Sequence, residues 1–275
     1  MEPTRQAALE RSRAATPLAI RRSGVRTASG SVLRFTGKAI VLDVEGTLCS
    51  RSYLQEVLEP YSRKHLAGFL RAYWFDGVIA RFRDQIAQEA GGTDFATWCQ
   101  VHPDSGEAFV KLYDEILSKL NRPMRSAALA ELLEAIWREG LRKDDLRSQV
   151  FPDVPAALRN WTKAGRDLRT FSTLSVSSQC ALLAKSTQGN LLGYFRDHYD
   201  TKLGCKRAPG SFCTIADDLR LEPREVLFVS DESAELDAAR VAGLATAWVQ
   251  RGNNGGVPPG SLHLGLSDLR ALAVV

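Results

Sequence analysis

The apolar positions of this chain change their spacing twice. Residues 38–42 form a short continuous apolar run, which predicts a buried strand. From residue 53 to about 148 the apolar positions recur with helical spacing, and no segment there has a convincing strand pattern. Beyond that region, strand-like runs at 167–173, 225–231 and 244–250 alternate with helical segments. The chain therefore predicts an α/β unit that is interrupted by a long helical insert.

Strands that alternate with helices predict a parallel sheet covered on both faces. We expect an α/β fold with a Rossmann-like, doubly wound parallel sheet and an inserted all-helical domain. The domain boundaries that follow are a core at 37–52 and 148–275, a helical insert at 53–147, and a disordered basic extension at 1–36.

The net positive charge of the chain is confined to its beginning. The net charge is +4, and residues 1–38 hold eight Lys or Arg and two acids, so this segment carries +6 and the remainder −2. A disordered extension or an upstream start codon explains such a segment; a nucleic-acid tail or an organelle transit peptide are the alternatives. The rest of the chain suggests no nucleic-acid partner and no membrane partner. The five scattered cysteines favour a reducing, cytoplasmic setting.

Polar residues follow three of the predicted strands at the point where each strand ends. Asp43, Ser172 and Asp231 stand at these ends. Parallel sheets bind ligands at the carboxyl ends of their strands, so the three residues predict a pocket there.

Carboxylates dominate this predicted pocket. Asp43 suits a nucleophile or a ligand for a hard metal ion, and Glu45 can face the same cavity because alternate residues of an extended chain share a side. Asp231 beside Asp43 would make an oxygen-rich Mg²⁺ site. The alternatives are a helix-capping aspartate for Asp43, a solvated loop acid for Glu45, and an acidic first helical turn for the further acids, which are Glu232, Glu235 and Asp237.

Hydroxyl groups and a lysine complete the predicted pocket. Ser172 and Thr173 end a strand just before a helix, where hydroxyl groups and free amides suit phosphate oxygens. Lys206 follows a glycine in a loop and could neutralise a phosphate. Helix caps and a surface lysine are the alternatives for these residues taken one at a time.

The order Asp-x-Glu-Gly-Thr, Ser-Thr, Lys, Ser-Asp resembles the haloacid dehalogenase-like superfamily, whose cap domain would be the helical insert. Within it, the chain is similar to the enolase-phosphatase family over roughly residues 38–255. The segments that carry this second resemblance are "LDVEGT", "FSTLSVSSQCALLAKSTQGNLLGYF", "YDTKLGCKRAPGSFCTIA", "VLFVSDESAELDAARVAGL" and "VQRGNN".

This resemblance implies a Mg²⁺-dependent phosphoric monoester hydrolase of methionine salvage, an acireductone synthase. Its substrate would be 2,3-diketo-5-methylthiopentyl 1-phosphate, which is enolised and dephosphorylated to an acireductone. Asp43 would be the nucleophile that forms an aspartyl phosphate. A monomer acting on a small phosphorylated metabolite is expected.

The same resemblance assigns roles to the other site residues. Asp43, Asp231 and the backbone carbonyl of Glu45 would bind Mg²⁺, and Glu45 would serve near the leaving group. Ser172 and Thr173 would hold the phosphate, whose charge Lys206 would balance.

The chain departs from the family pattern at several positions. Leu174 stands where the family has Gly, Ala130 where its cap has Lys, and Leu133-Glu134 where it has Gln-Gly. These changes motivate an alternative, a cap-diverged phosphatase acting on another small phosphorylated metabolite. A non-catalytic binding protein with the same fold is a third hypothesis.

Overall fold

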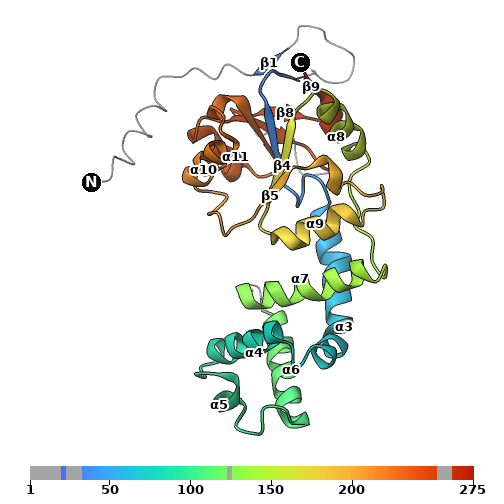
Figure 1. Cartoon of the computed structure of the whole chain (residues 1–275), viewed down its shortest axis with the longest axis vertical. Helices are drawn as coiled ribbons and strands as arrows, with labels where there is room; N and C mark the ends of the chain where they lie inside the picture. Colours follow the sequence, from blue (N-terminus) through green and yellow to red (C-terminus); the bar gives the residue numbers. More distant parts are fainter. Residues whose placement is uncertain (1–19, 23–32, 123–125, 253–261) are drawn as a thin grey trace, which may run out of the picture. The chain divides into compact units, whose positions relative to one another are not determined.

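The computed structural model describes residues 20–22, 33–122, 126–252 and 262–275. The chain divides into two compact units (Figure 1). We call the first, Met1–Tyr53 with Arg147–Val275, the core unit, and the second, Leu54–Leu146, the helical unit. No helix among the described residues is both long enough and apolar enough to cross a membrane.

A six-stranded parallel sheet organises the core unit, with the strand order β5-β4-β3-β6-β7-β8. The chain leaves the central strand β3 toward β4 and β5 on one side and later returns to build β6, β7 and β8 on the other. This order makes the sheet doubly wound. Its strands are β3 (Ala39–Leu42), β4 (Asp167–Phe171), β5 (Asp197–Tyr199), β6 (Val226–Ser230), β7 (Ala245–Val249) and β8 (Leu264–Leu266).

Helices cover both faces of this sheet, with α10 and α11 on one side and α8 on the other (Figure 1). Strands β3 and β6 are completely buried, which explains why their sequences are continuous apolar runs. The helices of the core unit are α2 (Arg51–Tyr53), α8 (Val154–Lys163), α9 (Val176–Ala184), η2 (Leu192–Tyr194), α10 (Pro209–Leu219), η3 (Pro223–Glu225), α11 (Ser233–Val241) and η4 (Leu269–Ala271).

A second sheet joins the two ends of the described chain. Strand β1 (Ile20–Arg22) pairs antiparallel with β2 (Leu33–Phe35), which runs parallel to β9 (Leu272–Val274). The basic extension expected at 1–36 lies mostly outside the described residues, and β1 and β2 are its described parts.

The helical unit has no strand among its described residues. Ser and Asp side chains cap several of its helices: Asp76, Asp94, Ser105 and Ser126 each accept a hydrogen bond from a backbone N–H of the first turn. The elements are η1 (Leu54–Leu58), α3 (Glu59–Ala72), α4 (Gly77–Glu89), α5 (Phe95–Cys99), α6 (Gly106–Leu120) and α7 (Ala127–Arg142).

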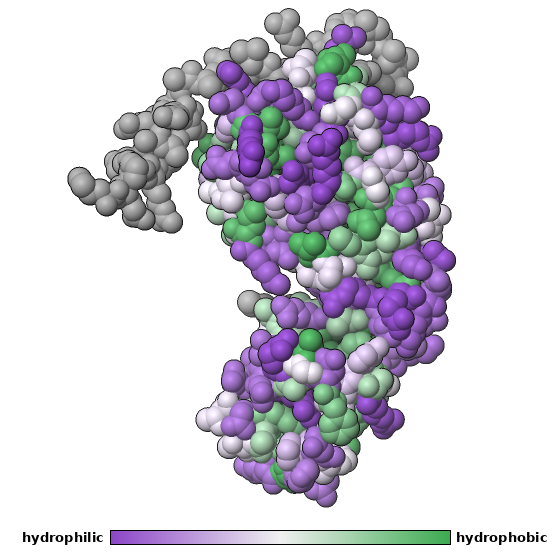
Figure 2. Space-filling model, viewed as in Figure 1, coloured by the Kyte–Doolittle hydropathy of each residue, from purple (hydrophilic) through white to green (hydrophobic). Residues whose placement is uncertain are grey.

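Each unit buries its own apolar side chains. Leu66, Leu112 and Ile136 are fully or almost fully buried in the core of the helical unit, whereas Phe212 and Phe228 lie in that of the core unit. On the visible face of both units hydrophilic residues prevail, with apolar residues between them (Figure 2). The predicted fold class, a doubly wound α/β sheet with an all-helical insert, is confirmed.

Candidate active site

Three neighbouring strands bring the predicted polar residues to one edge of the sheet. Leu42 of β3 pairs with Thr170 of β4 and with Val229 of β6. Because these strands are parallel and in register, Asp43, Ser172 and Asp231 emerge at the same edge.

A cavity of about 360 Å³ opens at this edge. Its lining mixes acidic, basic and hydroxyl side chains, which is typical of a site for a charged ligand. The lining residues are Asp43, Glu45, Arg51, Thr173, Thr201, Cys205, Lys206, Arg207, Glu232 and Glu235.

A buried charge cluster forms the inner wall of the cavity. The ammonium of Lys206 lies 2.5 Å from Asp43 Oδ1 and 2.8 Å from Glu235 Oε2. The hydroxyl of Ser230 donates a hydrogen bond of 3.0 Å to the same oxygen of Glu235. The side chains of Asp43, Lys206 and Glu235 are at most 10% exposed, so water screens their charges little.

Burial and pairing act in opposite directions on this cluster. Burial raises the pKa of Asp43 to about 7, and the charge of Lys206 opposes that rise. Burial would lower the pKa of Lys206, but the carboxylates of Asp43 and Glu235 outweigh it and raise that pKa. Lys206 is therefore the positive charge that allows Asp43 to ionise near neutral pH.

A hydrogen bond links the loops after β3 and β4. The hydroxyl of Thr173 donates to Glu45 Oε2, so the two residues line the cavity as a pair. Ser172, in contrast, is fully buried and does not line the cavity. Its hydroxyl oxygen accepts a hydrogen bond of 3.1 Å from the backbone N–H of Leu174, which shapes the loop.

Asp231 lies behind the cavity wall rather than in it. Its side chain is 3% exposed, and both of its oxygens accept hydrogen bonds from the guanidinium of Arg51, at 2.9 and 3.0 Å. Gly46 passes close to this carboxylate with a positive φ of 84°. A Cβ atom at Gly46 would lie 2.1 Å from Asp231 Oδ2, so only glycine fits there.

A buried arginine fixes the loop that carries Asp43 and Glu45. The guanidinium of Arg251 donates to the carbonyl of Thr47 at 2.7 and 3.1 Å and to Asp153 Oδ1 at 2.7 Å. The other oxygen of Asp153 accepts from the backbone N–H of Leu269 at 2.7 Å. Arg251 thus acts as a positioning residue for the loop.

The donor set fits a hard divalent cation, although the ligands are not assembled around one point. Asp43 and Asp231 supply carboxylate oxygens, which Mg²⁺ prefers. Each carboxylate is held by a cationic side chain, Lys206 or Arg51. Within the part of the chain that the structure describes, no group of three or more His, Cys, Asp and Glu side chains is arranged as a metal site.

The structure brings together Asp43, Glu45, Thr173 and Lys206 as cavity residues and places Ser172 and Asp231 behind them. Four further lining residues were not predicted from the sequence: Arg51, Thr201, Cys205 and Arg207. Arg51 follows Asp43 by only eight residues, and this closeness is the one sequence signal that could have indicated it.

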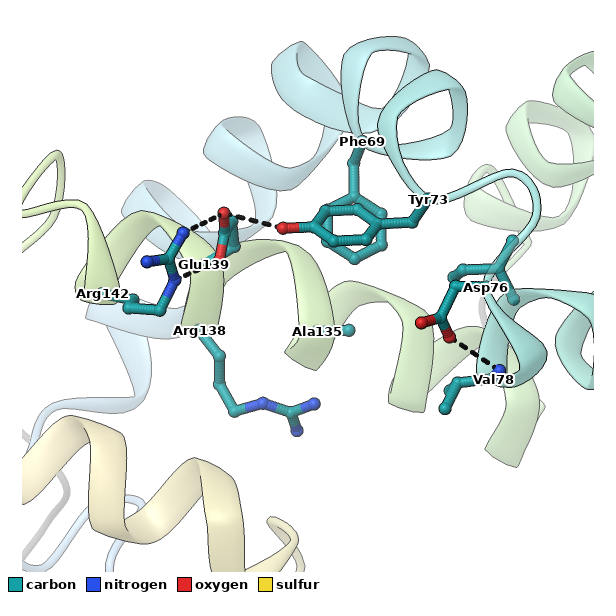
Figure 3. A pocket seen from close by; sticks show the side chains of 9 residues that line it. Phe69, Tyr73, Asp76, Val78, Ala135, Arg138, Glu139 and Arg142 are labelled. Atoms are coloured by element: carbon teal, nitrogen blue, oxygen red, sulfur yellow. Dashed lines mark hydrogen bonds and ion pairs between the residues drawn. The ribbon is translucent and has the colours of Figure 1, made fainter.

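A second cavity, of about 320 Å³, lies within the helical unit between the end of α3, the start of α4 and α7 (Figure 3). Its charges form an ordinary network, in which Glu139 accepts a hydrogen bond from Tyr73 at 2.9 Å and bonds of 2.7 Å from Arg142. Its lining residues are Phe69, Tyr73, Asp76, Val78, Ile79, Ala135, Arg138, Glu139 and Arg142.

The residues that depart from the family pattern lie in different surroundings. Leu133 is buried in the core of the helical unit, whereas Ala130 is exposed. Glu134 lies 3.8 Å from Arg138, with which it forms an ion pair. Leu174 is buried in the core unit, directly after Ser172 and Thr173.

Comparison with known proteins identifies the family of this chain. A family model described as a haloacid dehalogenase-like hydrolase matches residues 38–243, so the chain belongs to that family of hydrolases. A solved structure, the UTR4 protein from Saccharomyces cerevisiae, shares the fold with a TM-score of 0.67 at 23% identity; the match covers 85% of this chain and 98% of that one.

Within that family the chain is similar to enolase-phosphatases. The enolase-phosphatase E1 of Thioalkalivibrio sulfidiphilus is 35% identical over 79% of this chain and 92% of its own length. That of Granulibacter bethesdensis is 34% identical over 86% of this chain and 95% of its own length. The resemblance to the enolase-phosphatase family is thereby confirmed, and the chain is a phosphatase.

Proposed function

We propose that this protein is the Mg²⁺-dependent enolase-phosphatase of L-methionine salvage. It would enolise 2,3-diketo-5-methylthiopentyl 1-phosphate and remove its phosphate to yield the acireductone. The observation that carries the proposal is the buried Asp43–Lys206–Glu235 cluster at the carboxyl end of β3, in a chain whose relatives are named enolase-phosphatase E1. The five unpaired cysteines support a cytoplasmic location.

The proposed reaction transfers the phosphoryl group to Asp43. One oxygen of Asp43 attacks the phosphorus atom, the bond to the substrate oxygen breaks, and an aspartyl phosphate forms. Water then attacks the phosphorus, which releases inorganic phosphate and restores the carboxylate. Lys206 serves both steps because its positive charge, held beside Asp43, balances the charge of the phosphoryl group.

Glu45 is proposed to supply the proton to the leaving oxygen. It lies two residues after Asp43 and lines the same cavity. The hydroxyl of Thr173, which donates to Glu45, orients this carboxyl and presents itself to the phosphate. Ser172 is proposed to contribute from behind, because its hydroxyl accepts a hydrogen bond from the Leu174 N–H and so holds the loop that carries Thr173.

The residues that would hold Mg²⁺ are Asp43, Asp231 and the backbone carbonyl of Glu45. When bound, the ion would offset the repulsion between a carboxylate nucleophile and a phosphate dianion.

A panel of phosphorylated metabolites that includes the diketo phosphate tests this proposal. Phosphate release from the diketo phosphate should be rapid with the wild-type protein and absent with Asp43→Asn. The departures from the family pattern, among them Leu174 after Ser172 and Thr173, motivate a second candidate, a phosphatase for another small phosphorylated metabolite. Turnover of another phosphoester without turnover of the diketo phosphate would establish that candidate instead.

A further inference from the structure

We propose that Arg51 is an internal cation at Asp231, and that a divalent metal ion must displace its guanidinium from this carboxylate in order to bind. The inference rests on the proposed function, in which Asp231 is a metal ligand. It adds a residue that competes with the metal ion and so lowers the protein's affinity for it.

The contact between Arg51 and Asp231 uses both partners fully. Arg51 Nε donates to Oδ2 at 3.0 Å, and Nη2 donates to Oδ1 at 2.9 Å. This is a bidentate pair, in which the planar guanidinium matches the carboxylate and both oxygens are engaged at once. A metal ion that coordinates Asp231 needs one of these oxygens.

The surroundings of Asp231 restrict the alternatives. The Gly46 backbone passes so close that an added Cβ would lie 2.1 Å from Oδ2. A metal ion beside the guanidinium would also meet its positive charge in a poorly screened place, because the Asp231 side chain is only 3% exposed. Simultaneous binding of both cations is therefore unfavourable.

Arg51 can leave Asp231 without disturbing the core. Its side chain is 50% exposed, and both of its described hydrogen bonds go to Asp231. It belongs to the short helix α2 and lines the cavity, so the released guanidinium can turn toward solvent or toward the cavity. Displacement thus costs the Arg51–Asp231 pair and little else.

When a competing group occupies the binding site, the apparent dissociation constant of a ligand equals its intrinsic dissociation constant divided by the fraction of molecules in which the site is open. Removal of Arg51 should therefore tighten the binding of a divalent ion, and roughly 10-fold is the expected size for a pair with one exposed partner. Loss of any nearby positive charge would also help a metal ion to bind, so the test needs a charge-matched control.

Arg207 provides that control. It lines the same cavity, its side chain is 65% exposed, and its Nη2 lies 4.0 Å from Glu232 Oε2 rather than on Asp231. Arg207→Gln removes the same charge as Arg51→Gln. Arg51→Lys is a second variant, which keeps the positive charge but cannot form the bidentate pair with the Asp231 carboxylate.

The experiment titrates Mn²⁺ into the full-length protein without substrate and measures free Mn²⁺ by electron paramagnetic resonance. We expect roughly 10-fold tighter binding to Arg51→Gln, an intermediate gain for Arg51→Lys, and less than about 3-fold for Arg207→Gln. In a chelator, Arg51→Gln should melt below the wild type because Asp231 loses its partner, and Mn²⁺ should raise its melting temperature by more.

Equal Mn²⁺ affinity in the wild type and Arg51→Gln, or an equal gain in Arg207→Gln, would overturn the inference. If no variant binds Mn²⁺, both this inference and the metal part of the proposed function are wrong. Phosphate release by Asp43 is tested separately, through the metabolite panel.

Discussion

The cavity of the core unit that is lined by Asp43 and the cavity of the helical unit that is lined by Glu139 have similar volumes, about 360 Å³ and about 320 Å³, but the charged side chains around them differ in exposure. In the core unit, Asp43 and Lys206 are 2% and 5% exposed. In the helical unit, Glu139 is paired with Arg142, whose side chain is 68% exposed. Buried charges are costly unless they are paired, whereas exposed pairs contribute little either way. Retention of a buried cluster at a strand end therefore marks the site of chemistry more clearly than a cavity does.

The largest expected effect tests the core cavity. Asp43→Asn should lower kcat by roughly 10⁴-fold or more, because an amide cannot act as the nucleophile. The variant should still fold, since Lys206 keeps its partner Glu235 at 2.8 Å. Steady-state phosphate release, together with circular dichroism, measures both points. A folded Asp43→Asn protein that retains a tenth of the wild-type rate would place the chemistry elsewhere.

Replacement of Lys206 tests whether an ion pair contributes more to the stability of the protein when it is buried than when it is exposed. Lys206→Met leaves two buried carboxylates without their cation, and we expect a loss of about 3–5 kcal/mol in the free energy of unfolding. Lys38→Met is the control, because Lys38 pairs with Glu225 at 2.8 Å while its side chain is 65% exposed. This control should lose about 1 kcal/mol or less in urea unfolding. Equal losses would remove the distinction between buried and exposed pairs.

A comparison of two glycines with similar φ angles separates the cost of backbone strain from the cost of a steric clash. Gly46 in the core unit has φ 84° and Gly91 in the helical unit has φ 89°, yet an added Cβ meets Asp231 at the first and nothing within 4 Å at the second. Gly91→Ala should cost about 1 kcal/mol, and Gly46→Ala about 3 kcal/mol together with most of the activity. Urea unfolding and phosphate release measure the pair. A Gly46→Ala protein as stable and active as Gly91→Ala would contradict the close approach to Asp231.

The smallest effect belongs to the helical unit. The hydrogen bonds from Arg142 and Tyr73 lower the pKa of Glu139 to about 2. Because this pKa is lower in the folded protein, the stabilisation by Glu139 is present at neutral pH and is lost as the pH falls from about 4.5 to about 2. Its charged partners Arg142 and Lys143 are 68% and 54% exposed, so Glu139→Gln should cost only about 1 kcal/mol at pH 7. Urea unfolding of both proteins at pH 7 and pH 3 should show this difference shrink; a difference that stays constant would contradict the assignment.

The sequence predicted the central sheet because β3 and β6 are buried on both faces and are therefore continuous apolar runs. It indicated Asp43 and Lys206 through their motifs, but their contact joins residues 163 positions apart and depends on the folded sheet. Apart from its closeness to Asp43 in the sequence, Arg51 carries no pattern that separates it from a surface arginine. Strand β2 escaped prediction because three residues are too few for a period, and its partner β9 lies at the other end of the chain.

The most direct measurement of the central claim is chemical trapping of the phosphorylated enzyme. The protein is mixed with substrate, quenched in acid within a single turnover and reduced with borohydride, which converts an aspartyl phosphate to homoserine. Peptide mass spectrometry then locates the modified residue. We predict homoserine at position 43, only after mixing with a substrate that is turned over. Phosphate release without any modification, or with modification at another carboxylate, would contradict the account.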